Sequence, residues 1–227
     1  MCGRYTLATP DPGQLRARFA IGEGIEVRRR FNVAPGDDVL AVVQRGPEPP
    51  EGAVLRWGLV PPWAGDRSDL GVKTINARAE TVHERPAYRD AFAERRCLIV
   101  ADGFYEWHAG TPHWIRRADG EPFAFAGLWA SWRPRGEEAV EPLRSCAIVT
   151  TAASDAIRDL HDRMPVILLP GDECSWLAPT SSPETLHAVL DAAREQQLVA
   201  RPVSRAVNDA RHDAPDCLDP PEQAALF

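Results

Sequence analysis

Residues 97–102 read Cys-Leu-Ile-Val-Ala-Asp, and residues 123–132 read Phe-Ala-Phe-Ala-Gly-Leu-Trp-Ala-Ser-Trp. Both runs are short, apolar and rich in β-branched or aromatic side chains, which is typical of buried strands. A third run of this kind, Cys-Ala-Ile-Val-Thr, occupies residues 146–150. These three segments predict strands at the heart of the fold.

Weaker signals extend this pattern in both directions along the chain. Strands are expected at residues 39–43 and 54–57, separated by a turn at Gly-Pro-Glu-Pro-Pro, residues 46–50. Apolar periodicity predicts helices at residues 12–19, 87–95, 154–160 and 183–196. Because these helices do not alternate regularly with the strands, the pattern favours an α+β fold over a doubly wound sheet.

Length and composition exclude several classes of protein. The chain has 227 residues, 44% of them hydrophobic, which suffices for one large domain or two small ones. No stretch approaches the roughly 18 continuous apolar residues of a membrane span, and the N-terminus lacks the features of a signal peptide. We therefore expect a cytoplasmic protein that has no membrane partner.

The five cysteines are widely spaced and include no Cys-x-x-Cys pair. This argues against a disulfide framework and against a zinc site, so we expect neither a metal nor a cofactor. Cys97 and Cys146 each open an apolar strand, where a buried thiol is an ordinary core residue. Cys2 alone stands in a chemically suggestive position.

The net charge of −7 is unevenly distributed. Residues 1–100 carry 15 basic and 13 acidic groups, whereas residues 171–227 carry 4 and 10. Of the 26 basic residues, 25 are arginine, which suits phosphate contacts and base stacking but also follows from high-GC codon bias. Residues 208–227, rich in Asp, Pro and Ala, are expected to form an acidic surface tail.

The chain starts Met1-Cys2-Gly3-Arg4-Tyr5, so removal of Met1 would leave Cys2 as the N-terminal residue. A terminal cysteine carries a thiol with a reference pKa of about 8.5 and an α-amine with a pKa near 7.7 to 8.0, so both are usable near neutral pH. This 1,2-aminothiol closes a stable thiazolidine ring on an aldehyde.

Three internal segments carry further polar groups in settings that suggest chemistry. Asn76, Arg78 and Glu80 alternate with smaller side chains and would share one face of an extended segment. Glu106 lies among aromatic residues after an apolar strand, a setting that raises a carboxyl pKa into the general acid/base range. His161 follows a predicted helix, whose C-terminal dipole would favour imidazolium.

Each of these features has an ordinary structural explanation, but together and in this order they resemble the SRAP family, named for SOS-response-associated peptidase and understood as abasic-site processing proteins. The resemblance rests on six ordered motifs: residues 1–5, Phe31-Asn-Val-Ala-Pro-Gly36, Arg56-Trp-Gly-Leu-Val-Pro-Pro-Trp63, Ile75-Asn-Ala-Arg-Ala-Glu-Thr81, Gly103-Phe-Tyr-Glu-Trp107 and His161-Asp-Arg-Met-Pro165. It implies a single α+β domain over residues 1–207, with mostly antiparallel strands bent into a pseudo-barrel and peripheral helices, followed by the tail of residues 208–227.

The resemblance also implies a reaction. Cys2, freed of Met1, would attack the open-ring aldehyde of an abasic site in single-stranded DNA. Its amine would form a Schiff base, and its thiol would close the thiazolidine. Asn76 would hold the terminal amine or a sugar oxygen, Glu106 would move the proton that opens the sugar ring, and His161 would assist dehydration and its reversal.

Residues for DNA binding follow from the same resemblance. Arg4, Arg78 and Arg163 would contact phosphates, and Trp63 would stack on a base beside the lesion. The expected partner is single-stranded DNA that contains abasic sites. The protein would be a monomer associated with the nucleoid.

Three alternatives remain open from the residues alone. The first is a cysteine peptidase that removes its own Met1, with Cys2 as nucleophile, His161 as base and Glu106 as orienting group. The second is a non-covalent reader of modified DNA bases, which needs a base pocket but no free terminus. The third is a lysine-based lyase, which would depend on Lys73, the one lysine of the chain.

The extreme C-terminus carries a separate motif. Gln223 is followed by Leu226 and Phe227, which resembles the Gln-x-x-Leu-Phe peptides that dock on the bacterial sliding clamp. The sliding clamp is therefore a candidate second partner, to be weighed against an ordinary alternative. The ordinary alternative is that the two apolar side chains fold back onto the domain.

Overall fold

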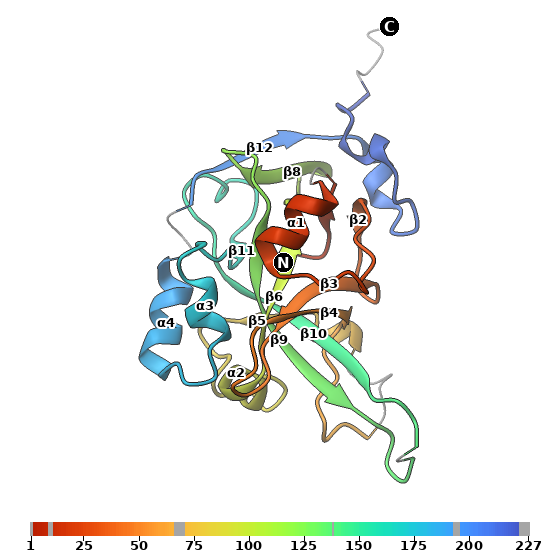
Figure 1. Cartoon of the computed structure of the whole chain (residues 1–227). Coiled ribbons are helices and arrows are strands. Elements are labelled where there is room, and N and C mark those ends of the chain that lie inside the picture. Colours follow the sequence, from red (N-terminus) through yellow and green to blue (C-terminus); the bar gives the residue numbers. More distant parts are fainter. Residues whose placement is uncertain (1, 9–10, 66–70, 138, 193–195, 223–227) are drawn as a thin grey trace, which may run out of the picture.

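The computed structural model describes residues 2–8, 11–65, 71–137, 139–192 and 196–222 (Figure 1). Its strands are β1 Tyr5–Leu7, β2 Arg30–Val33, β3 Asp38–Val43, β4 Glu51–Trp57, β5 Asn76–Arg78, β6 Arg96–Ala101, β7 Gly103–His108, β8 Thr111–Arg117, β9 Phe123–Trp132, β10 Leu143–Ala152, β11 Arg163–Pro165 and β12 Leu198–Pro202. Its α-helices are α1 Pro12–Phe19, α2 Arg89–Glu94, α3 Glu173–Leu177 and α4 Pro183–Ala192. No helix in these described ranges is long and apolar enough to cross a membrane.

Five strands close into a barrel. β4, β3, β6 and β9 pair in antiparallel fashion in that order, β9 pairs with β10, and β10 returns to β4 in parallel. The short strands β5 and β11 attach to β10 outside this ring. The predicted α+β fold with strands bent into a pseudo-barrel is therefore confirmed.

A second, antiparallel sheet runs in the order β12-β8-β7-β1-β2. Asp102, at the corner between β6 and β7, joins this sheet to the barrel. Its buried carboxylate accepts hydrogen bonds from Thr6 Oγ1 at 2.5 Å and from the Ala8 backbone N–H at 2.8 Å. The Asp102 carboxylate thus holds β1 against the barrel. Hydrogen bonds to a charged group are stronger than those between neutral groups.

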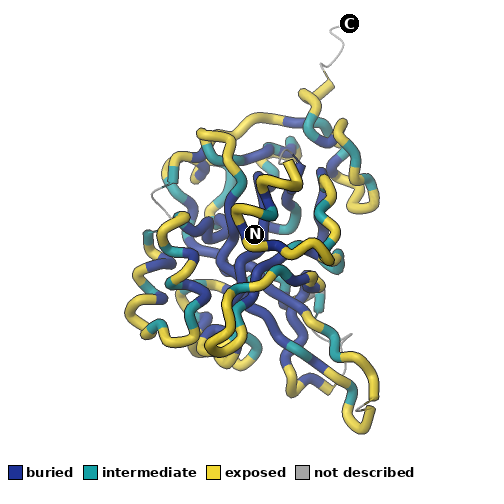
Figure 2. Tube along the Cα trace, viewed as in Figure 1, coloured by how far each residue is buried: buried dark blue, intermediate teal, exposed yellow. Residues whose placement is uncertain are grey.

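The barrel strands are largely buried (Figure 2), and their side chains contribute to two separate clusters. One cluster takes side chains from all five barrel strands and from β1, and it includes Cys2, Tyr5 and Trp57. Another packs the opposite strand faces beneath helices, with Leu15 of α1 and Trp176 of α3 among its members. Because α-helices lie over the second cluster, the cluster that holds Cys2 fills the barrel interior.

The helix expected at residues 12–19 is confirmed, and its boundaries follow from local chemistry. The Asp11 side chain accepts from the Gly13 backbone N–H at 2.8 Å, Pro12 occupies the first turn, and Ala20 ends the helix in the left-handed region at φ 51°. The helix expected at 87–95 is shorter, Arg89–Glu94, and the one at 183–196 begins at Pro183 as predicted.

The helix predicted at residues 154–160 is wrong. This segment forms consecutive turns, closed by backbone hydrogen bonds from Ile157 and Arg158 to Ser154 O and from His161 to Ile157 O. The chain must reverse there, because β11 pairs antiparallel with β10 directly after it. Tertiary pairing overrides the helical periodicity.

The first part of residues 208–227, the segment predicted to be a surface tail, packs against the domain. Asp213 accepts from the backbone N–H groups of Phe31 and Asn32, at 2.5 and 2.9 Å, and Cys217 is fully buried. Residues up to Leu218 are therefore packed against β2. Gln223, Leu226 and Phe227 lie outside the described residues.

Arg96, the first residue of β6, is a buried cation that joins two helices. Its guanidinium donates to the backbone oxygens of Phe92 and Ala93 in α2 and of Trp176 and Ala178 at the end of α3, at 2.6 to 2.7 Å. These are C-terminal carbonyls that lack partners within their helices, and a buried arginine satisfies them together.

We expect Arg96→Met to lower the free energy of unfolding by about 2–4 kcal/mol, because it leaves several buried carbonyls without their charged donor. Urea denaturation measures the loss. Arg89→Met is the matched control, since Arg89 is exposed and its guanidinium pairs with neighbouring Asp90; it should change stability by less than about 0.5 kcal/mol. Equal effects of the two substitutions would contradict the role given to Arg96.

Candidate active site around Cys2

Cys2 lies fully buried at the N-terminal side of β1. Tyr5 is paired with Phe104 of β7, and the Tyr105 backbone N–H donates to Arg4 O at 3.0 Å. Extending this antiparallel register toward the N-terminus would place Gly3 opposite Glu106 and leave Cys2 one residue further along. Cys2 therefore lies close to Glu106, whose carboxylate raises the pKa of the Cys2 thiol.

Asn76 holds the backbone of Cys2 from the other side. β5 pairs in parallel with β10, which places Asn76 opposite Ile148. The Asn76 Nδ2 donates to Cys2 O at 2.7 Å, and the Tyr88 hydroxyl donates to Asn76 O at 2.9 Å. Within the described ranges, the buried Asn76 Oδ1 has no hydrogen-bond partner, so an acceptor remains available beside Cys2.

Glu106 follows the apolar strand β6, as the sequence indicated, and lies within the next strand, β7, where the residue is 3% exposed. Burial, with a smaller contribution from Asp162, raises the pKa of Glu106 to about 7. The sequence predicted that an apolar environment would raise the pKa of this carboxyl group, and burial is the main cause of the shift. At neutral pH both protonation states are populated, which suits proton transfer in either direction.

His161 does not lie at a helix end, so the dipole argument for its protonation fails. Its Nδ1 accepts from the Arg163 backbone N–H at 2.9 Å, and Asp162 Oδ1 lies 2.8 Å from the same nitrogen. Nδ1 cannot serve as acceptor and donor at once. Because burial, the largest influence, lowers the pKa of His161, we assign a neutral ring that carries its proton on Nε2.

The Cys2 thiol is in its protonated form. Burial, reinforced by the neighbouring Glu106 carboxylate, raises the pKa of Cys2 well above its usual value. Its Sγ donates a weak hydrogen bond to Arg4 O at 3.8 Å. In this setting the sulfur is a neutral thiol rather than a thiolate.

The three arginines assigned to phosphates have different surroundings. Arg78 is exposed at the end of β5. Arg163 forms a bidentate ion pair with Glu80, at 2.6 and 3.0 Å, and also donates to Thr150 O at 2.7 Å. Arg4 donates to Asn32 Oδ1 at 2.9 Å and to Val207 O at 2.6 Å. Arg78 therefore has the guanidinium most available for a ligand.

Trp63 is 50% exposed, and its Nε1 donates to Pro86 O at 3.3 Å. The loop that carries it is anchored to the barrel, because Trp132 Nε1 donates to Ala64 O at 2.8 Å. The indole is presented at the surface over the loop that leads to Tyr88, which contacts Asn76. The arrangement offers a stacking face for a planar group.

Two residues near the site were missed by sequence reasoning. The Tyr88 hydroxyl donates to the main-chain oxygen of Asn76, and the charge of Asp162 contributes to the raised pKa of Glu106. Neither contact has a sequence signal, because both depend on the long-range pairing of β10 with β5 and β11.

A group of potential metal ligands lies elsewhere. Within the described residues, donor atoms of His212, Asp216 and Cys217 lie within 4.8 Å of one another. His212 Nε2 is 2.8 Å from Asp216 Oδ1, and Cys217 Sγ donates to His212 O at 3.6 Å. These contacts close the turn of residues 212–217 and do not reach the Cys2 site.

The fold and site together define a class of protein in which a barrel interior encloses a near-terminal cysteine beside an amide and a carboxyl group of raised pKa. The chain belongs to the family described as SOS response associated peptidase (SRAP), whose family model matches residues 1–210.

Several relatives span most of the chain. Abasic site processing protein YoqW from Bacillus subtilis is 38% identical over 96% of this chain and 99% of its own length. Abasic site processing protein YedK from Escherichia coli is 32% identical over 84% of each chain. Abasic site processing protein HMCES from Xenopus tropicalis is 32% identical over 73% of this chain and 56% of its own length.

Solved structures share the architecture. A protein from Bordetella bronchiseptica, 31% identical, superposes with a TM-score of 0.68 over 89% of this chain and all of its own. A protein from Bacteroides thetaiotaomicron superposes with a TM-score of 0.82 over 96% of this chain and 99% of its own, at 22% identity. The latter likeness concerns the fold alone.

Proposed function

We propose that this protein processes abasic sites in single-stranded DNA by forming a covalent crosslink through Cys2. The observation that carries the proposal is the enclosure of Cys2 between Asn76, which donates to its carbonyl, and Glu106, whose pKa is about 7. Family membership and the names of the relatives support abasic DNA as the substrate.

The proposed reaction balances without a cofactor. After Met1 is removed, the neutral α-amine of Cys2 adds to the aldehyde carbon of the ring-opened sugar and gives a carbinolamine. Loss of one water yields the imine. The thiol then adds across the C=N bond: sulfur bonds to carbon, and the thiol proton goes to nitrogen. The product is a thiazolidine, with one water released overall.

The surrounding residues have matching tasks in this scheme. Protonated Glu106 donates to the sugar ring oxygen as the hemiacetal opens, and its carboxylate takes up the proton released from the anomeric hydroxyl. Asn76 fixes the Cys2 backbone through Nδ2 and offers Oδ1 to the freed amine. A neutral thiol suits the last step, since its proton is needed on nitrogen.

The same observations weigh against two alternatives. A cysteine peptidase requires an activated thiolate, whereas burial raises the pKa of Cys2. A Schiff-base lysine is normally activated by desolvation, whereas Lys73 is exposed. Crosslinking through the Cys2 amine needs neither an activated thiolate nor a buried lysine.

His161 is proposed to donate a hydrogen bond from Nε2–H to the departing hydroxyl oxygen during dehydration of the carbinolamine, and to the same oxygen in the reverse step. We expect His161→Ala to slow release of preformed crosslink by roughly tenfold, which corresponds to the loss of about one hydrogen bond. Gel quantification of adduct decay after chase with excess unlabelled abasic DNA measures this. His161→Asn is the companion variant that keeps a polar side chain; wild-type decay in both would remove His161 from the mechanism.

DNA affinity should depend on Arg78 more than on Arg163. Each phosphate contact to single-stranded DNA contributes about −0.7 to the slope of log K against log salt. Arg78→Ala should flatten the slope by roughly that amount, whereas Arg163→Ala should change it less because Glu80 already pairs with Arg163. Fluorescence anisotropy at several salt concentrations gives both slopes. An unchanged slope in Arg78→Ala would show that the DNA-binding face is misplaced.

Intact mass spectrometry with and without abasic single-stranded DNA tests the proposal as a whole. The expected result is a protein lacking Met1 that gains the mass of the oligonucleotide minus one water. An oligonucleotide with tetrahydrofuran in place of the abasic sugar is the matched control, because it has no aldehyde. Absence of any covalent species with the aldehyde substrate would overturn the proposal.

A further inference from the structure

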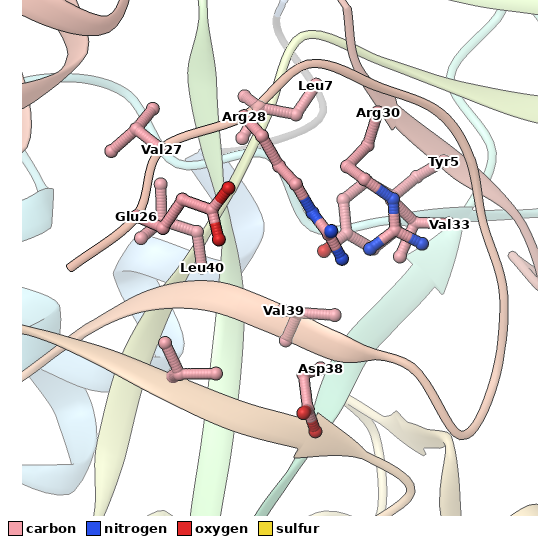
Figure 3. Close-up of a pocket in the computed structure, with 11 residues that line it drawn as sticks. Tyr5, Leu7, Glu26, Val27, Arg28, Arg30, Val33, Asp38, Val39 and Leu40 are labelled. Carbon is pink, nitrogen blue, oxygen red and sulfur yellow. The ribbon is translucent and has the colours of Figure 1, made fainter. Parts of the chain in front are cut away.

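A cavity of about 220 Å³ lies where β1 and β2 meet β3 and β4 (Figure 3). Its apolar walls come from Leu7, Val27, Val33, Val39, Leu40 and Val54. An apolar cavity of about 150 Å³ takes up a benzene molecule, so this one is large enough for a larger planar ring. Neither the family resemblance nor the proposed reaction uses this cavity.

The polar groups of the cavity include two that lack protein partners. Tyr5 is 2% exposed, yet its hydroxyl forms no hydrogen bond within the described part of the chain. Arg28 is exposed at the cavity edge and likewise forms no hydrogen bond or ion pair there. Arg30, in contrast, is neutralised by Asp37 and Asp213. The Tyr5 hydroxyl and the Arg28 guanidinium are therefore polar groups that a ligand in the cavity could bind.

Donors and acceptors lie on different sides of the cavity. Figure 3 shows the Tyr5 hydroxyl at the arginine end, with the carboxylate of Glu26 across the cavity and that of Asp38 below. Both carboxylates line the cavity and are exposed to solvent. The cavity therefore offers apolar walls for the faces of a ring, a guanidinium fork for acceptors and carboxylates for N–H donors.

We propose that this cavity is a nucleobase site selective for guanine. The Arg28 guanidinium would donate to O6 and N7, which is the commonest specific contact between arginine and a base. Glu26 or Asp38 would accept from N1–H and the N2 amino group, and the Tyr5 hydroxyl would supply another donor. Adenine presents an amino group where guanine presents O6, so the arginine fork would face a donor.

The guanine has two sources, a free nucleotide or a base within single-stranded DNA. Calorimetric titrations with dGMP, dAMP, dCMP and dTMP test the first source. Anisotropy titrations with an oligothymidylate, with and without one guanine, test the second. We expect guanine to bind roughly tenfold more tightly than the other bases, within the range for one bidentate contact. Equal binding of all four bases from both sources would overturn the proposal.

Two variants of the cavity sharpen the test. Val54→Trp fills the cavity from an exposed rim position, and Val199→Trp, at a similarly exposed valine on β12, is its control. The guanine preference should disappear in the first and persist in the second. Arg28→Lys should also lose the preference, because lysine keeps the charge but not the fork. A preference for guanine that persists in Val54→Trp would contradict the assignment of this cavity as the guanine site.

This inference goes beyond the proposed crosslinking and can fail separately from it. Cys2→Ala should bind guanine like the wild type, and Val54→Trp should crosslink an abasic oligothymidylate at the wild-type rate. Normal crosslinking without any base preference would remove only the guanine site. Base preference without crosslinking would remove only the proposed reaction.

Discussion

Cys2→Ala is expected to form no heat-stable adduct with abasic single-stranded DNA. Alanine at the terminus retains the amine, so an imine can still form, but without sulfur the thiazolidine cannot close. Denaturing gel electrophoresis after heating measures the stable product. An N-terminal tag that cannot be removed should have the same effect, since it converts the amine into an amide that does not condense with aldehydes.

The controls separate the chemistry of Cys2 from that of thiols in general. Cys174→Ser removes the exposed cysteine on α3 and should leave the adduct intact. Cys2→Ser should give an adduct that survives heating only after borohydride reduction, because the imine is trapped before it hydrolyses. An undiminished heat-stable adduct from Cys2→Ala or from the tagged protein would falsify the thiazolidine mechanism.

Glu106→Gln is expected to slow adduct formation by roughly 10²-fold, the low end for loss of a general acid or base. The amide preserves size and hydrogen bonding but cannot transfer a proton. Single-turnover kinetics with saturating DNA measures the step, and anisotropy should show unchanged binding. Above the pKa of about 7, the protonated fraction of Glu106 falls tenfold per pH unit, so the wild type should lose rate there by this route.

The same variant should be more stable than the wild type at alkaline pH. Burial raises the pKa of Glu106 above its unfolded value, so the folded state holds its proton longer and stability falls as pH rises from about 4.5 through 7. Glutamine has no ionisable group to bury. The free energy of unfolding of Glu106→Gln should therefore exceed that of the wild type by on the order of 1–3 kcal/mol at pH 8 and by little at pH 4. Urea denaturation at both pH values checks it; a pH-independent difference would contradict the raised pKa.

The sequence predicted secondary structure accurately where one signal, a continuous run of apolar residues, dominated a segment. Residues 123–132 and 97–102 are uniformly apolar, so β9 and β6 were found within one residue of their observed limits. β1 and β12 were missed because each is short and is held in place by partners distant in sequence. Residues 154–160 have helical spacing, but the antiparallel return into β11 imposes turns.

The sequence predicted which residues form the candidate site, but it did not predict most of the contacts between them. The residue types and order identified Cys2, Asn76 and Glu106 as candidates, and the structure brings Asn76 to the Cys2 carbonyl. The sequence did not predict the ion pair between Arg163 and Glu80. It also did not predict that Tyr88 donates a hydrogen bond to Asn76. Both depend on which strands lie beside β10, and one sequence carries no direct record of strand order.

The complete burial of Cys2 bears on how the protein matures in the cell. An aminopeptidase needs an extended, accessible terminus, whereas Cys2 is fully buried next to the strand β1 that pairs with β7. The proposed reaction requires loss of Met1, so its removal by an aminopeptidase would compete with folding while the nascent chain emerges from the ribosome. Chains that fold too early would have to cleave the bond themselves or stay inactive, so expression rate and host aminopeptidase supply would determine the active fraction of a preparation.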